Sequence, residues 1–178
     1  MAKMTVEDTS LTAVADAIRT AKGTTNELTF PDGFTDSIGE LRRKDYTYSI
    51  LDRSATEITA DMLQGITKIG NSATYGLPNL VSAEIPEGVI VADSYFLNNC
   101  FKLKYVTLPS TLKSIGSSSF GSQLKRIVCK AITPPALSNR FNMESGGQVI
   151  IPKGTLESYQ NATNWSIWAD YMVESEDF

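Results

Sequence analysis

The chain repeats itself between residues 66 and 129, and this repetition limits the possible folds more than any other feature. Apolar residues recur at a spacing of 23 residues, and the third copy is two residues short in its second half. A period of about 20 to 29 residues is typical of proteins whose units cannot close a core alone and therefore stack on one another. The three copies are Ile66, Ile69, Leu80, Ala83 and Ile85; Val89, Ala92, Leu103, Val106 and Leu108; and Leu112, Ile115, Leu124, Ile127 and Cys129.

The repeats resemble the BspA-like class of leucine-rich repeats. The pattern of that class is Ile-Gly-x-x-x-Phe, then a Cys or Asn, then Leu-x-x-Val-x-Ile-Pro. Ile115-Gly116 with Phe120 matches its first part, and segments 80–86 and 103–109 match its last part. Thr74 and Leu97 depart from it, because Phe is usual there. The resemblance implies a short solenoid of about three 23-residue repeats in which Phe120 is buried, and the short third copy predicts that the array ends there.

We therefore predict an α+β chain with four parts. Residues 1–45 form a small helical unit for attachment or oligomerisation, because apolar residues recur at helical spacing from Leu11 to Ala21. Residues 46–65 form a connector and an N-terminal cap, residues 66–135 the leucine-rich repeats, and residues 136–178 a C-terminal cap.

The segment from Ser10 to Phe34 closely resembles an N-terminal module of tail and other virion-associated proteins of phages that infect Gram-positive and gut bacteria. This resemblance implies a virion setting. Because 45 residues with two apolar stripes make a marginal core, we expect a homo-oligomer and favour a trimer.

The C-terminal quarter, including Ser158 to Trp165, resembles the way BspA-like arrays finish. A last strand and a short helix are expected to seal the open end of the stack. The two tryptophans also fit a carbohydrate platform, but core packing is the favoured interpretation. The acidic tail from Glu174 to Phe178 is expected to be loose or held by a partner. The predicted plug consists of Tyr159, Trp165, Ile167, Trp168 and Tyr171.

The composition and the absence of known catalytic motifs argue against an enzyme. The chain has no histidine, the commonest general base and transition-metal ligand, and no phosphate loop, nucleophile elbow or metal-ligand cluster. We expect no enzyme activity, no cofactor and no metal site. Cys100 and Cys129 occupy apolar repeat positions and are expected to be buried thiols. Neither a membrane span nor a secretory signal is visible, so we expect synthesis in a host cytoplasm and no membrane insertion. We also expect no nucleic-acid partner.

Candidate binding residues follow from strand alternation, which turns Ser82, Tyr105 and Arg126 outward in one row. We predict a partner-binding face at Lys104, Tyr105, Thr107 and Arg126. Its expected ligand is a host cell-surface glycan or protein, including anionic wall polymers. Residues 90–130 hold six basic side chains, which form either one anion-binding patch or, as favoured here, a solvated face.

The sequence thus predicts a phage virion structural protein on a tail, a baseplate or a head. Its solenoid is expected to adhere to the host surface or to a neighbouring virion protein. The alternative is a bacterial surface or interaction module that carries the same repeats without a virion role.

Overall fold

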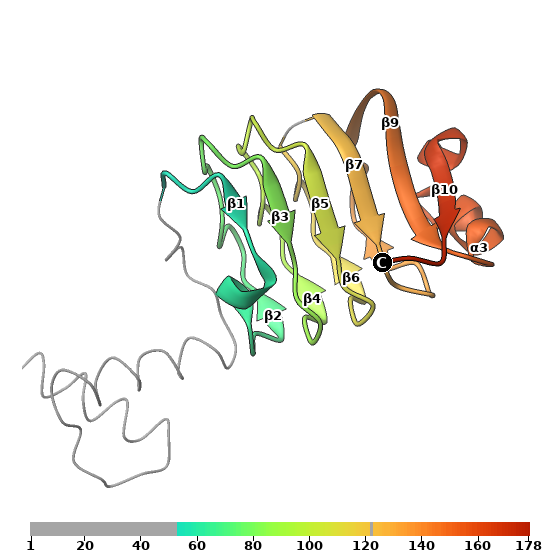
Figure 1. Cartoon of the computed structure of the whole chain (residues 1–178), viewed down its shortest axis with the longest axis horizontal. Helices are drawn as coiled ribbons and strands as arrows, with labels where there is room; N and C mark the ends of the chain where they lie inside the picture. The colour runs from blue at the N-terminus through green and yellow to red at the C-terminus, as the bar shows by residue number, and fades with distance from the viewer. Residues whose placement is uncertain (1–52, 122) are drawn as a thin grey trace, which may run out of the picture.

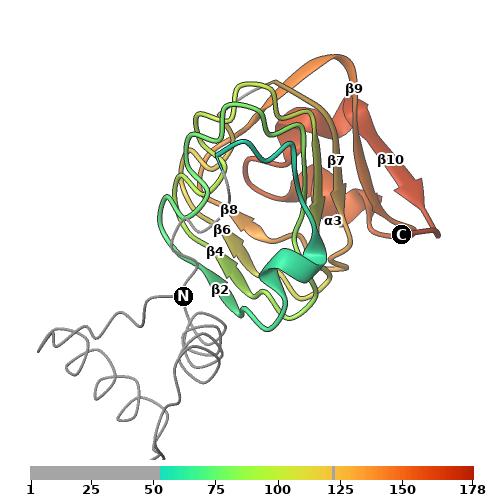
Figure 2. The same cartoon turned by 60° about the vertical axis from the view of Figure 1, so that its left-hand side comes forward.

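The computed structural model describes residues 53–121 and 123–178. The predictions for residues 1–45 and for the connector up to residue 52 lie outside this part of the chain. In the described part, successive turns of the chain stack side by side and contribute strands to two parallel sheets, as Figures 1 and 2 show. Sheet A has the order β1-β3-β5-β7-β9-β10 and sheet B the order β2-β4-β6-β8. The strands are β1 (Glu57–Ile58), β2 (Lys68–Ile69), β3 (Ser82–Glu84), β4 (Val91–Ala92), β5 (Tyr105–Leu108), β6 (Ser114–Ile115), β7 (Gln123–Cys129), β8 (Ala136–Leu137), β9 (Asn142–Pro152) and β10 (Met172–Ser175).

The 23-residue repeat is visible as strand register. Ser82 pairs with Tyr105 in sheet A, and Lys68 pairs with Val91 in sheet B, each 23 residues on. Tyr105 pairs with Arg126 only 21 residues on, so the third copy absorbs its missing two residues before β7 without losing register. Sheet A does not end with that short copy, because β9 and β10 continue it.

The core lies between the two sheets, where the apolar repeat positions meet. Leu80, Ala83 and Ile85 and their equivalents in the next two copies are buried, as the repeat pattern predicts. Phe120 is also buried and forms a bridge with Leu97 of the preceding turn. The second sheet was not predicted as a sheet, since its two-residue strands are too short to show alternation.

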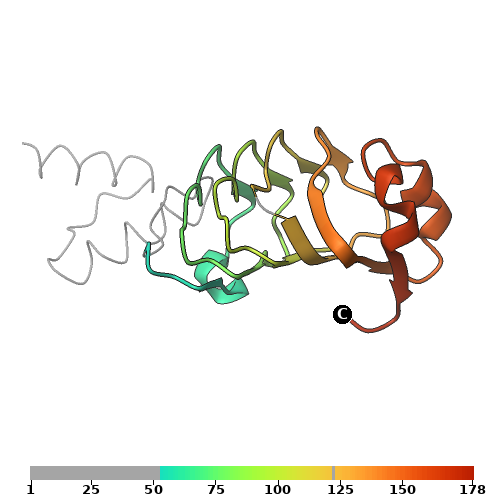
Figure 3. The ribbon, with the colours of Figure 1, turned by 90° about the horizontal axis from the view of Figure 1, so that it is seen from above.

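A short α-helix and a 3-10 helix cover the C-terminal end of the stack (Figure 3). They are α3 (Leu156–Asn161) and η2 (Ser166–Tyr171); another 3-10 helix, η1 (Ala60–Leu63), follows β1. Tyr159 and Trp165 are fully buried, and Trp168 and Tyr171 pack against the core, which favours packing over a carbohydrate platform.

Two expectations for this end of the chain are wrong. Ile167 is 49% exposed and is no part of the plug, because it lies on the outer side of η2. The acidic tail from Glu174 to Phe178 is not loose at its start, since Glu174 and Ser175 belong to β10, which pairs with β9. Its carboxylates also hold it: Glu174 accepts a hydrogen bond from the Leu156 amide at 2.9 Å, and Glu176 forms an ion pair with Lys153.

Candidate functional site

The outer face of sheet A presents two rows of side chains that cross the strands. Each row alternates with the buried residues of the same strands, because neighbouring side chains of a strand point to opposite sides of the sheet. The first row comprises Glu57, Ser82, Tyr105, Arg126 and Gln148, and the second row comprises Glu84, Thr107, Val128 and Ile150.

Three of the four predicted binding residues share this face. Tyr105 and Arg126 are direct register partners on β5 and β7, and Thr107 lies between Glu84 and Val128 in the second row. Tyr105 is 38% exposed. Lys104 lies at the rim of the sheet instead, where its ammonium group forms an ion pair with Glu144. The partner of Lys104 was not predicted, because it is 40 residues away in sequence and sits in an irregular part of β9.

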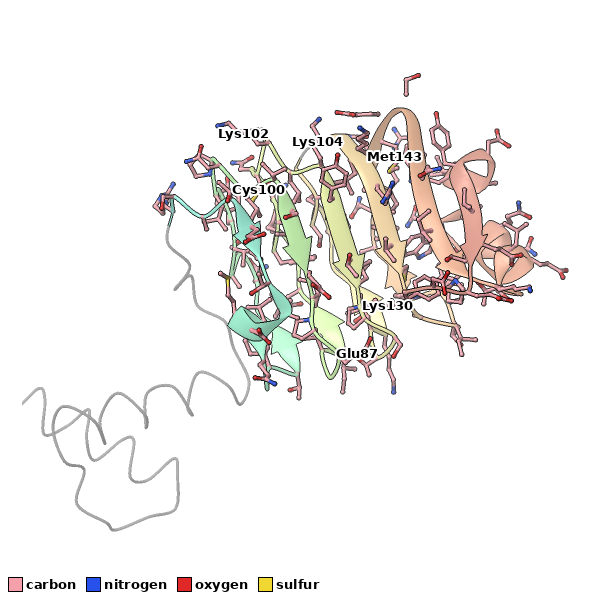
Figure 4. The ribbon with its side chains drawn as sticks, viewed as in Figure 1. Glu87, Cys100, Lys102, Lys104, Lys130 and Met143 are labelled. Carbon is pink, nitrogen blue, oxygen red and sulfur yellow. The ribbon has the colours of Figure 1, made fainter. Side chains whose placement is uncertain are left out.

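The basic side chains do not gather into one patch. Figure 4 shows Lys102 and Lys104 at one edge of the stack and Lys130 at the opposite edge, near Glu87. Lys102 donates to Asn79 at 2.9 Å, and Lys68 pairs with Asp93 at 3.0 Å. This distribution favours the interpretation of a solvated surface over that of a single anion-binding patch.

A shallow hollow of about 190 Å³ lies beside Tyr105 on the outer face of sheet A. It forms because the small Ser82 stands between the larger Glu57 and Tyr105 in the first row. Glu84 and Thr107 of the second row also line it. The hollow is therefore acidic and rich in hydroxyl groups. Glu57 was not identified from the sequence, because its strand precedes the recognisable repeats. The strand pairing of Glu57 with Ser82 places it in the first row.

A larger hollow of about 510 Å³ lies where the turn after β5 meets the loop after β7. Lys113 and Ile132 line it, and Ile132 is 75% exposed. On the same edge, the Glu87 carboxylate accepts hydrogen bonds from the Ser110 amide at 2.9 Å and the Ser110 hydroxyl at 2.7 Å. These bonds tie one turn of the stack to the next.

The two thiols are buried and free of disulfides. Burial raises the pKa of both Cys100 and Cys129, so neither is a ready nucleophile. The Tyr159 hydroxyl lies 3.1 Å from the Cys129 sulfur and donates to the Ala131 carbonyl at 2.7 Å, and burial raises its pKa as well. Residues 53–121 and 123–178 contain no group of three or more Cys, Asp or Glu side chains placed to hold a metal ion.

In the described part of the chain, no helix has the length and apolar content needed to cross a membrane.

Comparison with known proteins agrees with the geometry of the stack. The family model described as BspA type Leucine rich repeat region matches residues 46–164 in six copies. The match begins before β1 and extends beyond α3. No curated protein matches the chain.

Proposed function

This chain belongs to the BspA-type leucine-rich repeat family, and we propose that it is a capped solenoid that serves as a binding module rather than an enzyme. The observation that carries this proposal is the outer face of sheet A. Its two rows place Tyr105 beside Arg126 on a regular parallel sheet, and a shallow hollow adjoins them. Repeat stacks offer such extended faces to partners, and exposed Tyr and Arg side chains are frequent anchors of protein contacts.

Within this proposal, the partner contacts Tyr105, Thr107 and Arg126. Lys104 lies at the rim of this site, in an ion pair with Glu144. The mixed charge of the face favours a protein or a glycan with polar groups over a purely anionic polymer, because Glu57 and Glu84 would repel the latter. The binding chemistry requires no cofactor.

The setting proposed for this module is a phage virion, on a tail, a baseplate or a head, with the chain made in the host cytoplasm. The resemblance of Ser10 to Phe34 to a module of virion-associated proteins supports it. The alternative is a bacterial surface or interaction module with no virion role. Mass spectrometry of purified particles separates the two, since only the first predicts peptides of this chain in the particle.

Adsorption to host cells tests the binding face. We expect the double variant Tyr105→Ala, Arg126→Ala to lose most of its adsorption while its unfolding transition stays close to that of the wild type. A matched control is Val91→Ala, Lys113→Ala, which removes an apolar and a basic side chain on and beside sheet B. If both double variants adsorb like the wild type, the outer face of sheet A does not bind the host.

A further inference from the structure

The first row of sheet A carries charges of opposite sign at two of its positions. Glu57 on β1 and Arg126 on β7 are separated by Ser82 on β3 and Tyr105 on β5. Both charged side chains are exposed. Within the described residues, neither forms an ion pair or a side-chain hydrogen bond. Both charges are therefore available to a partner.

The shapes of the two middle residues are complementary as well. Ser82 forms the floor of the hollow of about 190 Å³, and the adjacent Tyr105 projects from the same face with 38% of its surface exposed. The row thus runs in the order acid, hollow, protrusion, base. Reversing this order puts an acid against a base and a protrusion against a hollow. A face with that property is self-complementary, as a twofold interface requires.

We propose that the outer face of sheet A pairs with the same face of a second copy of this chain. The twofold axis lies between β3 and β5 and runs along the strands. The rotation places Glu57 opposite Arg126 of the second copy, and Tyr105 opposite the hollow at Ser82. This inference rests on the proposed function in one respect, since it uses the face that the proposed function assigns to binding.

The second row supports this axis independently. The same rotation places Glu84 on β3 opposite Thr107 on β5 of the second copy. A carboxylate there accepts a hydrogen bond from a hydroxyl, and the contact occurs twice by symmetry. An axis that crosses the strands along the first row would instead set Glu57 against Glu57 and Arg126 against Arg126 of the second copy, because it leaves the order of the strands unchanged. The charge pattern therefore favours the axis along the strands over that one.

The size of the face sets the strength of the pairing. The facing region is four strands wide, from β1 to β7, which spans about 15 Å at about 4.8 Å between neighbouring strands. The two rows lie two residues, or about 7 Å, apart along the strands, so the region that carries both rows covers roughly 100 Å². This area is well below the roughly 800 Å² per partner that standard interfaces bury. We therefore expect a weak pairing that forms where copies are concentrated.

Charge exchange tests the pairing in the full chain. Sedimentation equilibrium at up to about 1 mM protein measures the association. We expect Glu57→Arg alone and Arg126→Glu alone each to weaken self-association at least about tenfold, because each brings like charges together twice. An equimolar mixture of the two variants, and the variant carrying both changes, restore it, because each acid again faces a base.

Matched controls change charge outside the face. Glu157→Arg on α3 and Lys113→Glu beside β6 are expected to associate like the wild type. A mixture that associates no better than the single variants, or single variants that associate like the wild type, overturns the proposal. Adsorption separates this result from the proposed function. If the Tyr105→Ala, Arg126→Ala variant loses adsorption and the wild type does not self-associate, the proposed binding module stands and the proposed pairing is wrong. If pairing depends on charge and this variant adsorbs like the wild type, the pairing stands and the proposed binding module is wrong.

Discussion

The Trp165 indole donates a hydrogen bond of 2.8 Å to the Pro135 carbonyl, at the start of the last strand of sheet B. Trp165 is fully buried, and the amide of the adjacent Asn164 donates to the Leu137 carbonyl at 2.6 Å. Side chains of the C-terminal segment thus occupy carbonyl groups that a further strand would otherwise use. This is how the open edge of sheet B is satisfied at its last strand.

Trp165→Phe is expected to destabilise the protein by about 1 to 3 kcal/mol, because it leaves the buried Pro135 carbonyl without a donor while an aromatic ring remains. Urea unfolding monitored by circular dichroism measures the loss. Ile167→Ala serves as the control, since that side chain is 49% exposed and its truncation should change the free energy of unfolding little. Equal stability of Trp165→Phe and the wild type would show that the hydrogen bond contributes nothing.

Phe120→Ala is expected to cost about 3 to 5 kcal/mol, as a large-to-small change in a core. The centroid of the Phe120 ring lies 5.6 Å from the ring centroids of both Phe96 and Phe141, and both contacts are edge-to-face. Loss of the Phe120 ring therefore opens a cavity between successive turns. The midpoint of chemical unfolding gives the difference. A cost below about 1 kcal/mol would contradict the burial of this ring.

Gly116→Ala is expected to destabilise by about 1 to 3 kcal/mol or more, because an added Cβ would clash with the backbone of the preceding turn. It would lie 2.4 Å from the Ser94 amide nitrogen and 2.7 Å from the Asp93 carbonyl carbon. Thermal unfolding compares it with Ser117→Ala, a neighbouring change that adds no atoms. A Gly116→Ala variant as stable as Ser117→Ala would mean that the turns lie farther apart than described.

Glu87 predicts a specific dependence of stability on pH. Partial burial alone would raise the pKa of its carboxyl group, but the hydrogen bonds from Ser110 and the charge of Lys130 hold it below the ordinary value of 4.5. The ionised form is therefore favoured by folding. Its contribution is present above about pH 4.5 and is lost as the pH falls through the lower pKa of the folded state.

Glu87→Gln is accordingly expected to be less stable than the wild type at about pH 7 and equally stable at about pH 3. The difference at neutral pH should stay below about 1 kcal/mol, because solvent screens this exposed group. Unfolding free energies at both pH values measure it. A difference that grows as the pH falls would have the wrong sign for a lowered pKa.

The inward positions of the stack could be predicted from the sequence because each is repeated at a constant spacing. Ile85, Leu108 and Cys129 differ in chemistry, yet all three are buried at equivalent places. The same periodicity predicted that Tyr105 and Arg126 would lie side by side, and their register confirms it.

The features that the sequence did not predict depend on contacts between residues that are not equivalent positions of neighbouring repeats. The ion pair between Lys104 and Glu144 joins strands that are 40 residues apart, and β9 reaches Lys104 only through its irregular pairing with β7. The C-terminal segment from Glu174 to Phe178, which begins in β10, has an acidic sequence that is typical of a solvated tail. Its order comes from pairing with β9 and from the bonds that Glu174 and Glu176 make to Leu156 and Lys153.

Hydroxyl-radical footprinting of the full chain, free and bound to host cells or particles, tests most directly whether the outer face of sheet A is the binding surface. We expect strong protection on binding at Tyr105 and at segments 82–84 and 126–128, and unchanged reactivity at Lys68, Val91 and Ser114 of sheet B. Protection confined to sheet B, with Tyr105 as reactive as in the free chain, would contradict the account.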